Sequence, residues 1–260
     1  MIFLSEDQAI FRTLIHSIGQ PGACPDDPGE LLLALAAFFL GTPYASHTLE
    51  QEDGEELIIN LRQLDCFTLV ENSLVLARLI RTGRTSWPEF TAALQASRYH
   101  QGLPDGFASR RHYFCDWLAA NQSQGFLKDI TSTIGGLPRQ KQINFLTTHR
   151  NEYPALTSPD TYQRLRSVEE ICSARCYHHI PAAAVPECSA RIKNGDLIAI
   201  TTAVAGLDVV HVGLAMHLPR GLHLLHASKR AGLVIVSPET IYRYLRQRKS
   251  RLGIMVARIL

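Results

Sequence analysis

The feature that most constrains the fold is the order of hydrophobic patterns along the chain, with helical spacing first and strand-like runs last. Five short apolar or alternating runs occupy the last third, and glycines punctuate the links between the first four. Strands in such close succession pair antiparallel, because a parallel neighbour requires a longer crossover. We expect strands at 197–202, 209–217, 222–227, 233–236 and 253–259.

The N-terminal third favours helices instead. Ser5 is a residue type that caps helices, so we expect a helix from Ser5 to about residue 18, ended by the glycines and proline at 19–22. A second helix is expected over 30–40, and a third from 65 past 79, where apolar residues recur with helical spacing.

The middle of the chain, at about 84–190, differs from both ends because prolines interrupt it throughout. We expect mixed helices and loops there, laid over the core. The sequence thus predicts an α+β fold in three segments: helices at 1–83, a helical and loop insertion at 84–190, and an antiparallel sheet at 191–260. In this prediction the residues up to 83 and those from 191 onward form one core.

A balanced composition argues against several classes of protein. The chain has 260 residues, of which 46% are hydrophobic and 19% are charged, so a packed core is expected rather than disorder. The formal net charge is only +2, so nucleic acid is not an expected partner. One basic run is expected to be a solvated helix end or loop: Arg243, Arg246, Arg248, Lys249 and Arg251.

No segment has the length and composition of a membrane span. The longest apolar run, at 31–40, has half the roughly 20 residues that a bilayer helix needs, and its position and flanks do not suit a signal peptide. We expect a cytoplasmic protein, or a periplasmic or secreted one whose signal peptide has been removed. The oligomeric state stays open, with a monomer favoured.

The cysteines are scattered and do not form the pattern of a disulfide scaffold, so mostly reduced thiols are expected. Cys172 and Cys176, with His178 and His179 nearby, allow a zinc interpretation. No second Cys or His pair follows at zinc-finger distance, so we do not expect a metal site.

Cys66 lies where the third helix should begin. Asp65 is a favourable N-cap, so Cys66 falls in the first turn, where unpaired N–H groups and the helix dipole favour a thiolate. The negative charge of Asp65 opposes this, and a neighbouring histidinium would still be needed. The alternative is that Cys66 is a small apolar residue on a buried helix face.

His211 lies in the second expected strand. Simple alternation puts Val210 and Val212 on one face, and His211 with Gly213 on the other. The second face carries small residues beside His211, which could let the N-terminus of a helix approach the strand closely. The alternative is a histidine that is satisfied in the core or at the surface.

The next strand carries two more histidines. If His217 pairs with Leu222 across the turn between the strands, His211 and His226 lie diagonally on one face, about 7–8 Å apart. A slip of one residue would put His223 there instead, so the choice between them depends on register.

A nucleophile at a helix start, a base on a strand and an orienting group on the next strand together follow the general logic of catalytic triads. In this arrangement Cys66 attacks a carbonyl, His211 takes and returns the proton, and His226 holds the imidazole of His211. The backbone N–H of Cys66 could bind the oxyanion.

Several long motifs in a single order also resemble a known family. The chain resembles the NlpC-type papain-like cell-wall hydrolases, and most closely their N-acetylmuramoyl-L-alanine amidase-like branch. The motifs are PY (43–44), TLE (48–50), DCFTLVE (65–71), SRRHYFCDW (109–117), INFL (143–146), GLDVVHVG (206–213) and LHAS (225–228).

The resemblance implies a papain-like core with a helical insertion over the active site. It implies a cysteine amidase that cuts the bond between muramic acid and L-alanine, preferably in free anhydro-muropeptides. Its catalytic residues would be Cys66, His211 and His226. Peptidoglycan fragments would be its partners, and neither a metal nor an organic cofactor is expected.

The chain departs from the endopeptidase relatives in an informative way. These typically have Asp-Cys-Ser-Gly at the nucleophile, where the Asp, the Ser and an upstream Tyr hold a free amine. This chain keeps Asp65 and Tyr44 but has Phe67 and Thr68 in place of Ser-Gly. That weakens the expectation of a free-amine substrate, although Tyr44 could still line the cleft rather than pack in the core.

Three further residues are candidate substrate contacts. Arg110 and His112, in the insertion, could reach sugar or peptide carboxylates, and a structural salt bridge is equally open for Arg110. Asp208 could orient His211 or only shape the turn before it. The competing functions are a stem-peptide endopeptidase with the same three residues, an inactive binding or effector module, and a zinc-binding interaction protein.

Overall fold

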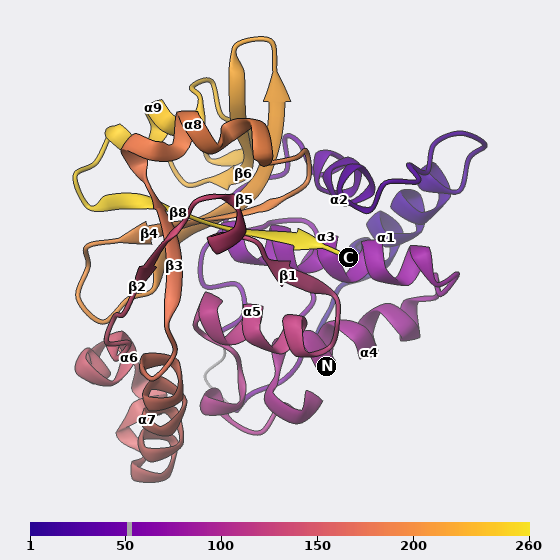
Figure 1. The fold of residues 1–260 in the computed structure, drawn as a ribbon. Helices are drawn as coiled ribbons and strands as arrows, with labels where there is room; N and C mark the ends of the chain where they lie inside the picture. Colours follow the sequence, from indigo (N-terminus) through magenta and orange to yellow (C-terminus); the bar gives the residue numbers. More distant parts are fainter. Residues whose placement is uncertain (51–53) are drawn as a thin grey trace.

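The computed structural model describes residues 1–50 and 54–260, and within them the α+β fold is confirmed (Figure 1). Most of the helices precede the strands of the main sheet. The helices are α1 (Ser5–Ile18), α2 (Pro28–Ala37), α3 (Cys66–Arg81), α4 (Trp87–Arg98), α5 (Phe114–Ser123), α6 (Phe145–Thr148), α7 (Pro159–Ser173), α8 (Val185–Cys188) and α9 (Ile241–Arg246). The strands are β1 (Leu127–Asp129), β2 (Leu137–Arg139), β3 (Tyr177–Pro181), β4 (Leu197–Thr202), β5 (Val209–Leu218), β6 (Gly221–Ser228), β7 (Leu233–Val236) and β8 (Arg251–Ile259).

The strands form an antiparallel sheet in the order β2-β3-β8-β4-β5-β6-β7, and β1 also pairs with β8. The expected meander from β4 to β7 is confirmed. β8 does not continue the meander, because α9 lies between β7 and β8 and the chain returns to the middle of the sheet. β8 therefore lies between β3 and β4 and ties the last strand of the chain to the middle segment.

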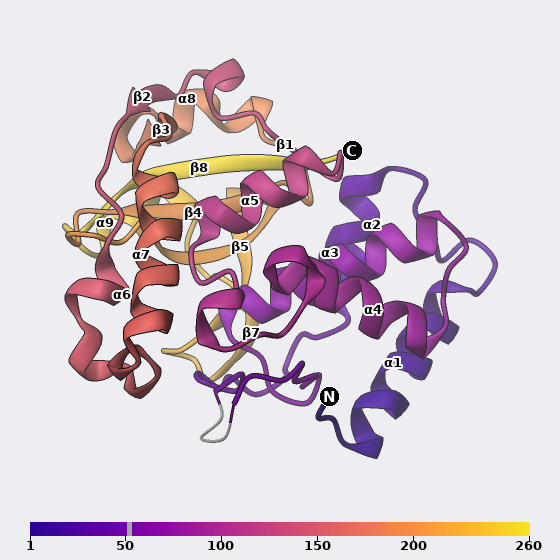
Figure 2. The same ribbon diagram turned by 90° about the horizontal axis from the view of Figure 1, so that it is seen from below.

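The two faces of the sheet are covered by different helices. One face packs on the N-terminal helices through a large core, in which α3 contacts both β5 and β6. The other face packs on α8 and α9 through a smaller core. Figure 2 shows α1 to α4 grouped at one end of the molecule, with α6 and α7 at the opposite end. Because sheet and helices share these cores, the ends of the central strands are held firmly in place.

The middle segment contains more regular structure than the sequence indicated. It has its own small core around Tyr113, Leu156 and Leu165, which joins α5 and α7. It also supplies β1, β2 and β3 to the sheet, where the sequence predicted only helices and loops. Two of these strands are three residues long, too short for a recognisable alternating pattern.

The helix boundaries follow local capping chemistry. The first helix spans the expected residues, but Leu4 rather than Ser5 is its N-cap, and the Asp7 carboxylate accepts the Leu4 N–H at 2.8 Å. The second helix starts earlier than expected because Asp27 caps it, and it ends at Ala37. Among the described residues, no helix is both long enough and apolar enough to cross a bilayer.

Candidate active site

Helix α3 begins at Cys66, and Asp65 is its N-cap as predicted. The Asp65 Oδ1 atom accepts the backbone N–H of Phe67 at 3.0 Å and that of Thr68 at 2.8 Å. The Thr68 side chain in turn accepts the Asp65 N–H at 3.0 Å, which completes a capping box. Cys66 is therefore held rigidly in the first turn of a helix whose next two N–H groups already have partners.

The surroundings of Cys66 favour the neutral thiol. Burial raises the pKa of the Cys66 thiol to about 12, and the negative charge of Asp65 adds to that increase. The backbone N–H groups of Val212, Cys66 and Phe67 act in the opposite direction, because they stabilise a thiolate. The Val212 N–H thus lies beside the sulfur, which brings Cys66 against the residue that follows His211.

A β-bulge in β5 precedes Val212. Along β4 the pairing changes from Ile200 with His211 to Thr201 with Val209, so Val210 is an extra residue. The expected alternation is therefore wrong at Val210, which is 38% exposed and does not share the buried face of Val212. A bulge bends the strand and turns its side chains, and here it does so at His211.

The small-residue face of β5 does not pack against the helix that begins at Cys66, contrary to the sequence-based expectation. Helix α3 packs against the face that carries Val212 and Leu214. The opposite face, with Ala215, packs beneath α9. Gly213 is small because a Cβ atom there would lie 2.7 Å from the Leu225 carbonyl oxygen. The element that lies close to Gly213 is therefore the neighbouring strand β6 and not helix α3.

The register between β5 and β6 is the one that places His226 beside His211. His217 pairs with Leu222 as assumed, and Met216 pairs with His223. The His211 Nε2 and His226 Nδ1 atoms are 2.6 Å apart, and the two rings are nearly perpendicular. His223 points to the other face of the sheet, where its Nδ1 lies 2.8 Å from the Ser237 carbonyl oxygen.

Both histidines are shifted towards their neutral forms. The pKa of His211 is lowered to about 3 by burial first, then by the neighbouring His226 and the positive charge of Arg251. The pKa of His226 is lowered to about 4 by burial first and then by Arg251. The Tyr244 ring of α9 packs 6.1 Å from the His211 ring and 5.5 Å from the His226 ring. The Arg251 guanidinium lies 3.9 Å from the centre of the Tyr244 ring. The histidine pair thus lies beside an aromatic ring, Tyr244, that the sequence did not single out, and near Arg251, which the sequence placed in a solvated basic run.

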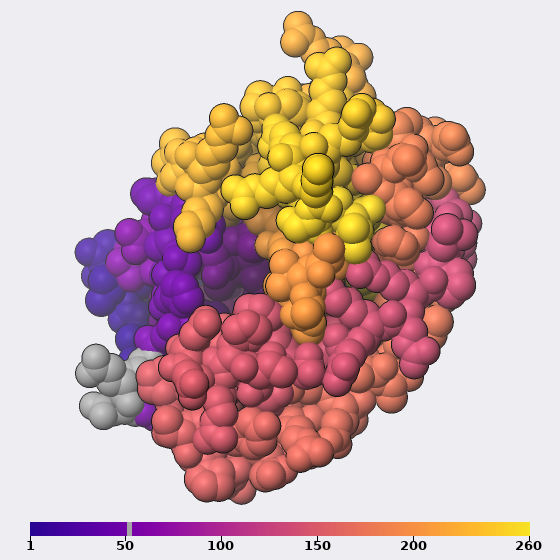
Figure 3. Space-filling view, turned by 90° about the vertical axis from the view of Figure 1, so that its left-hand side faces the viewer, coloured from indigo at the N-terminus to yellow at the C-terminus, as the bar shows by residue number. Residues whose placement is uncertain are grey.

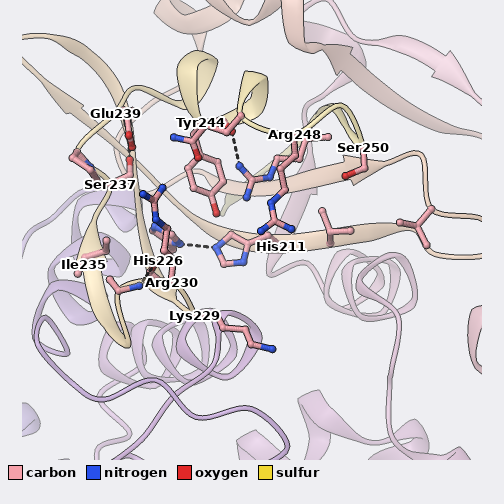
Figure 4. A pocket seen from close by; sticks show the side chains of 17 residues that line it. His211, His226, Lys229, Arg230, Ile235, Ser237, Glu239, Tyr244, Arg248 and Ser250 are labelled. Carbon is pink, nitrogen blue, oxygen red and sulfur yellow. Dashed lines mark hydrogen bonds between the residues drawn. The ribbon is translucent and has the colours of Figure 1, made fainter. Parts of the chain in front are cut away.

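A cavity of about 1140 Å³ opens beside the histidine pair. His211, His226 and Tyr244 line it, and Cys66 lies outside its lining. Figure 3 shows a hollow bounded by N-terminal, middle and C-terminal segments of the chain, and the residues that line the cavity all lie between Val204 and Arg251. In Figure 4 the bonded histidines lie at the wall of the cavity, with Tyr244 over them. A ligand in the cavity can therefore reach His211 directly.

Tyr44 and Asp65 lie on the cysteine side of the site. The backbone of Tyr44 forms an isolated parallel β-bridge with Leu64, the residue just before the N-cap of α3. The Tyr44 N–H donates to the Gly232 carbonyl at 2.7 Å. The pKa of the Tyr44 hydroxyl is raised by burial first, and then by its nearness to Cys66 and Asp65. The structure thus brings Tyr44 and Asp65 together with the cysteine.

Arg110 and His112 have protein partners of their own. Arg110 is buried, and its guanidinium donates to the Leu49 carbonyl at 2.6 Å and lies 3.6 Å from the Glu55 carboxylate. His112 Nε2 lies 2.7 Å from the Phe107 carbonyl oxygen, and burial lowers its pKa to about 3. Arg110 thus joins the middle segment to the N-terminal segment, and His112 holds a loop within the middle segment. A substrate role for either residue stays a prediction.

Asp208 is buried, and the partners of its carboxylate are backbone N–H groups. Its carboxylate accepts the N–H of Cys115, at the start of α5, and the N–H of Val209, each at 2.8 Å. The position that would orient His211 is occupied by His226. Asp208 therefore fixes the start of β5 to α5.

The cysteines of the zinc interpretation have different surroundings. Cys172 is buried beside Cys115 in the core of the middle segment, whereas Cys176 is exposed. All the cysteines are free thiols. Within the described residues, no cluster of three or more His, Cys, Asp or Glu side chains is arranged to hold a metal ion.

Comparison with known proteins places this site in a family. A family model described as AmiA-like, N-acetylmuramoyl-L-alanine amidase-like, matches residues 34–254. Cys66, His211 and His226 all fall within that match. No curated protein matches the chain.

Solved structures are similar over nearly the whole chain. An N-acetylmuramoyl-L-alanine amidase from Bacteroides uniformis is 35% identical, with a TM-score of 0.84, and the match covers 90% of this chain and 99% of that one. A Bacteroides fragilis structure described as a candidate xylanase is 37% identical, with a TM-score of 0.81 over 86% of this chain and 98% of that one. A Legionella pneumophila protein shares the fold: it is 22% identical, with a TM-score of 0.72, and the match covers 98% of this chain and 95% of that one. The chain belongs to the AmiA-like, N-acetylmuramoyl-L-alanine amidase-like family.

Proposed function

We propose that this protein is a cysteine amidase that hydrolyses the amide bond between N-acetylmuramic acid and L-alanine in peptidoglycan fragments, with anhydro-muropeptides as its preferred substrates. The observation that carries the proposal is the 2.6 Å bond between His211 and His226 in the wall of a cavity, with the residue after His211, Val212, placing its N–H beside the Cys66 sulfur. The family match and the Bacteroides uniformis amidase support the choice of bond.

The bond between the histidines sets the proton positions. If His211 donates its Nε2–H to the Nδ1 atom of His226, then Nδ1 of His211 carries no proton and can accept one. His211 is then a general base for the Cys66 thiol, and His226 is a positioning residue. Because burial disfavours both a thiolate and an imidazolium, the proton moves as the sulfur attacks.

The reaction then follows covalent catalysis. The Cys66 sulfur attacks the carbonyl carbon of the lactyl amide, and His211 takes the thiol proton. The carbon–nitrogen bond breaks, His211 gives that proton to the L-alanine nitrogen, and the stem peptide leaves as an amine. A water molecule, deprotonated by His211, hydrolyses the thioester and regenerates the thiol.

The helix start also suits the developing oxyanion. The N–H groups of Phe67 and Thr68 already donate to Asp65. The Cys66 N–H lies close enough to its own sulfur to stabilise a thiolate, and an oxyanion that forms next to the sulfur can accept from the same N–H. This accounts for the nucleophile's place at the first helical residue.

Two other activities are less well supported. An endopeptidase would use the same three residues, but Phe67 and Thr68 replace the residues that hold a free amine in those relatives. A xylanase breaks glycosidic bonds, which commonly requires two carboxyl groups facing each other across the bond. Among the residues that line the cavity, Glu239 is the one acidic side chain.

The test is product analysis by mass spectrometry after incubation with a defined anhydro-muropeptide. We expect free stem peptide and intact amino sugar from the wild type, and no turnover from Cys66→Ala. Cys24→Ala, which removes an exposed thiol, is the matched control and should retain full turnover. A shortened stem still attached to the sugar would identify an endopeptidase, and turnover by Cys66→Ala would exclude Cys66 as the nucleophile.

A further inference from the structure

The cavity beside the histidine pair is strongly cationic. Its lining includes Lys229 and Arg230 from the turn between β6 and β7, Arg248 from the loop after α9, and Arg251 at the start of β8. Glu239 is the one carboxylate among the lining residues. The chain as a whole is nearly neutral, with 26 Lys and Arg against 24 Asp and Glu, so this is a local concentration of charge. Such a cavity attracts anions.

Three of these cations have no protein partner among the described residues. Arg251 is engaged, because its guanidinium packs on the Tyr244 ring and donates to the Tyr244 carbonyl oxygen. Lys229, Arg230 and Arg248 are exposed, and neither an ion pair nor a side-chain hydrogen bond occupies them in the described part of the chain. Their charges are therefore available to a ligand inside the cavity.

The location of these cations relates them to the reaction. Figure 4 shows Lys229, Arg230 and Arg248 around the bonded pair of His211 and His226. A scissile amide placed at His211 has to extend one of its two halves into this space. The N-acetylated anhydro-sugar half carries no charge once its lactyl carboxyl is in the amide bond. The stem peptide carries free carboxylates beyond its first alanine.

We propose that Lys229, Arg230 and Arg248 form a carboxylate-binding subsite for the stem peptide, the half of the substrate that leaves as an amine. The assignment rests on the proposed function for the identity of the ligand. Arginine binds carboxylates through two parallel N–H donors, which suits Arg230 and Arg248 for fixing the direction of the peptide. The subsite thereby selects substrates with a charged stem.

The subsite can be tested by binding alone. The probes are the free tripeptide L-alanyl-γ-D-glutamyl-diaminopimelate and the same peptide with its carboxylates amidated, each titrated into the wild-type protein by calorimetry. We expect the acidic peptide to bind about tenfold or more tightly than the amidated one, and its affinity to fall as salt is raised. In the double variant Arg230→Gln, Arg248→Gln the preference should fall to less than twofold.

A matched control and a kinetic readout complete the test. Arg243→Gln changes an exposed arginine on α9 that lies outside the cavity lining, and it should bind both peptides as the wild type does. With an acidic muropeptide the double variant should raise KM by about tenfold and change kcat by less than twofold, with an unchanged melting temperature.

The outcomes separate the subsite from the activity. Equal binding of the acidic peptide by the wild type and the double variant would overturn the subsite, even if the amidase activity is established. Arginine-dependent peptide binding without hydrolysis of any muropeptide would refute the proposed function and support the subsite as an acidic-peptide site.

Discussion

Replacing His226 by alanine should lower kcat by about 10- to 100-fold and leave KM within about threefold of the wild type. The His226 Nδ1 atom is 2.6 Å from His211 Nε2, and His226 is only 1% exposed. Truncation removes one hydrogen bond, worth about 1 kcal/mol, and leaves the His211 nitrogen without its partner, which costs about 1–3 kcal/mol more. At about 1.4 kcal/mol for each factor of ten, the sum of about 2–4 kcal/mol corresponds to a loss of about 30- to 700-fold. Water that enters the cavity can replace the missing partner of His211 in part, which brings the expected loss down to about 10- to 100-fold.

The assay is steady-state release of stem peptide from an anhydro-muropeptide, with urea unfolding to show that each variant is folded. His226→Asn keeps an amide that can accept from His211, so it should recover part of the lost rate. His223→Asn is the matched control on the same strand, because His223 points to the opposite face and bonds the Ser237 carbonyl. A kcat of His226→Ala within twofold of the wild type would refute the positioning role.

Three further predictions concern stability. Gly213→Ala should lower the free energy of unfolding by about 2 kcal/mol, because the new Cβ would press on the Leu225 carbonyl oxygen; an unchanged urea midpoint would contradict this. Glu71→Ala should lower the free energy of unfolding by about 3–5 kcal/mol, because it leaves the buried guanidinium of Arg98 without its carboxylate. A decrease below about 1 kcal/mol in chemical unfolding would show that the ion pair is dispensable. Because burial lowers the pKa of His226 to about 4, below its unfolded value near 6.5, folding keeps it neutral, and the unfolded chain takes up the proton as the pH falls from 6.5 to 4. Stability is therefore lost across that window, and urea titrations at pH 7 and pH 5 should show that the wild type loses about 2 kcal/mol more than His226→Asn; equal losses would contradict the shift.

The predictable parts of the fold are those with a local signal. Asp65 has a side chain that caps helices, and it starts α3 at the cysteine. The strands from β4 to β7 follow one another through short turns, so their order could be predicted from the chain, as could the register between β5 and β6. The choice of His226 over His223 depended on His217 pairing with Leu222, and the structure confirms that pairing.

The parts that could not be predicted depend on distant contacts. The bulge at Val210 is invisible in the sequence because the valines around it continue the strand pattern. The position of β8 depends on pairing with β3 and β4 from far along the chain. The basic run near the C-terminus looks like a solvated helix end, and only the return of the chain at α9 places Arg248 and Arg251 in the cavity.

The most direct measurement of the central claim is the mass of the acyl-enzyme, trapped by rapid acid quench during turnover of an anhydro-muropeptide. We predict a thioester adduct with the mass of the anhydro-muramoyl group, located by peptide mapping on the fragment that contains Cys66. An adduct with the mass of part of the stem peptide, or one on a different residue, would contradict the account.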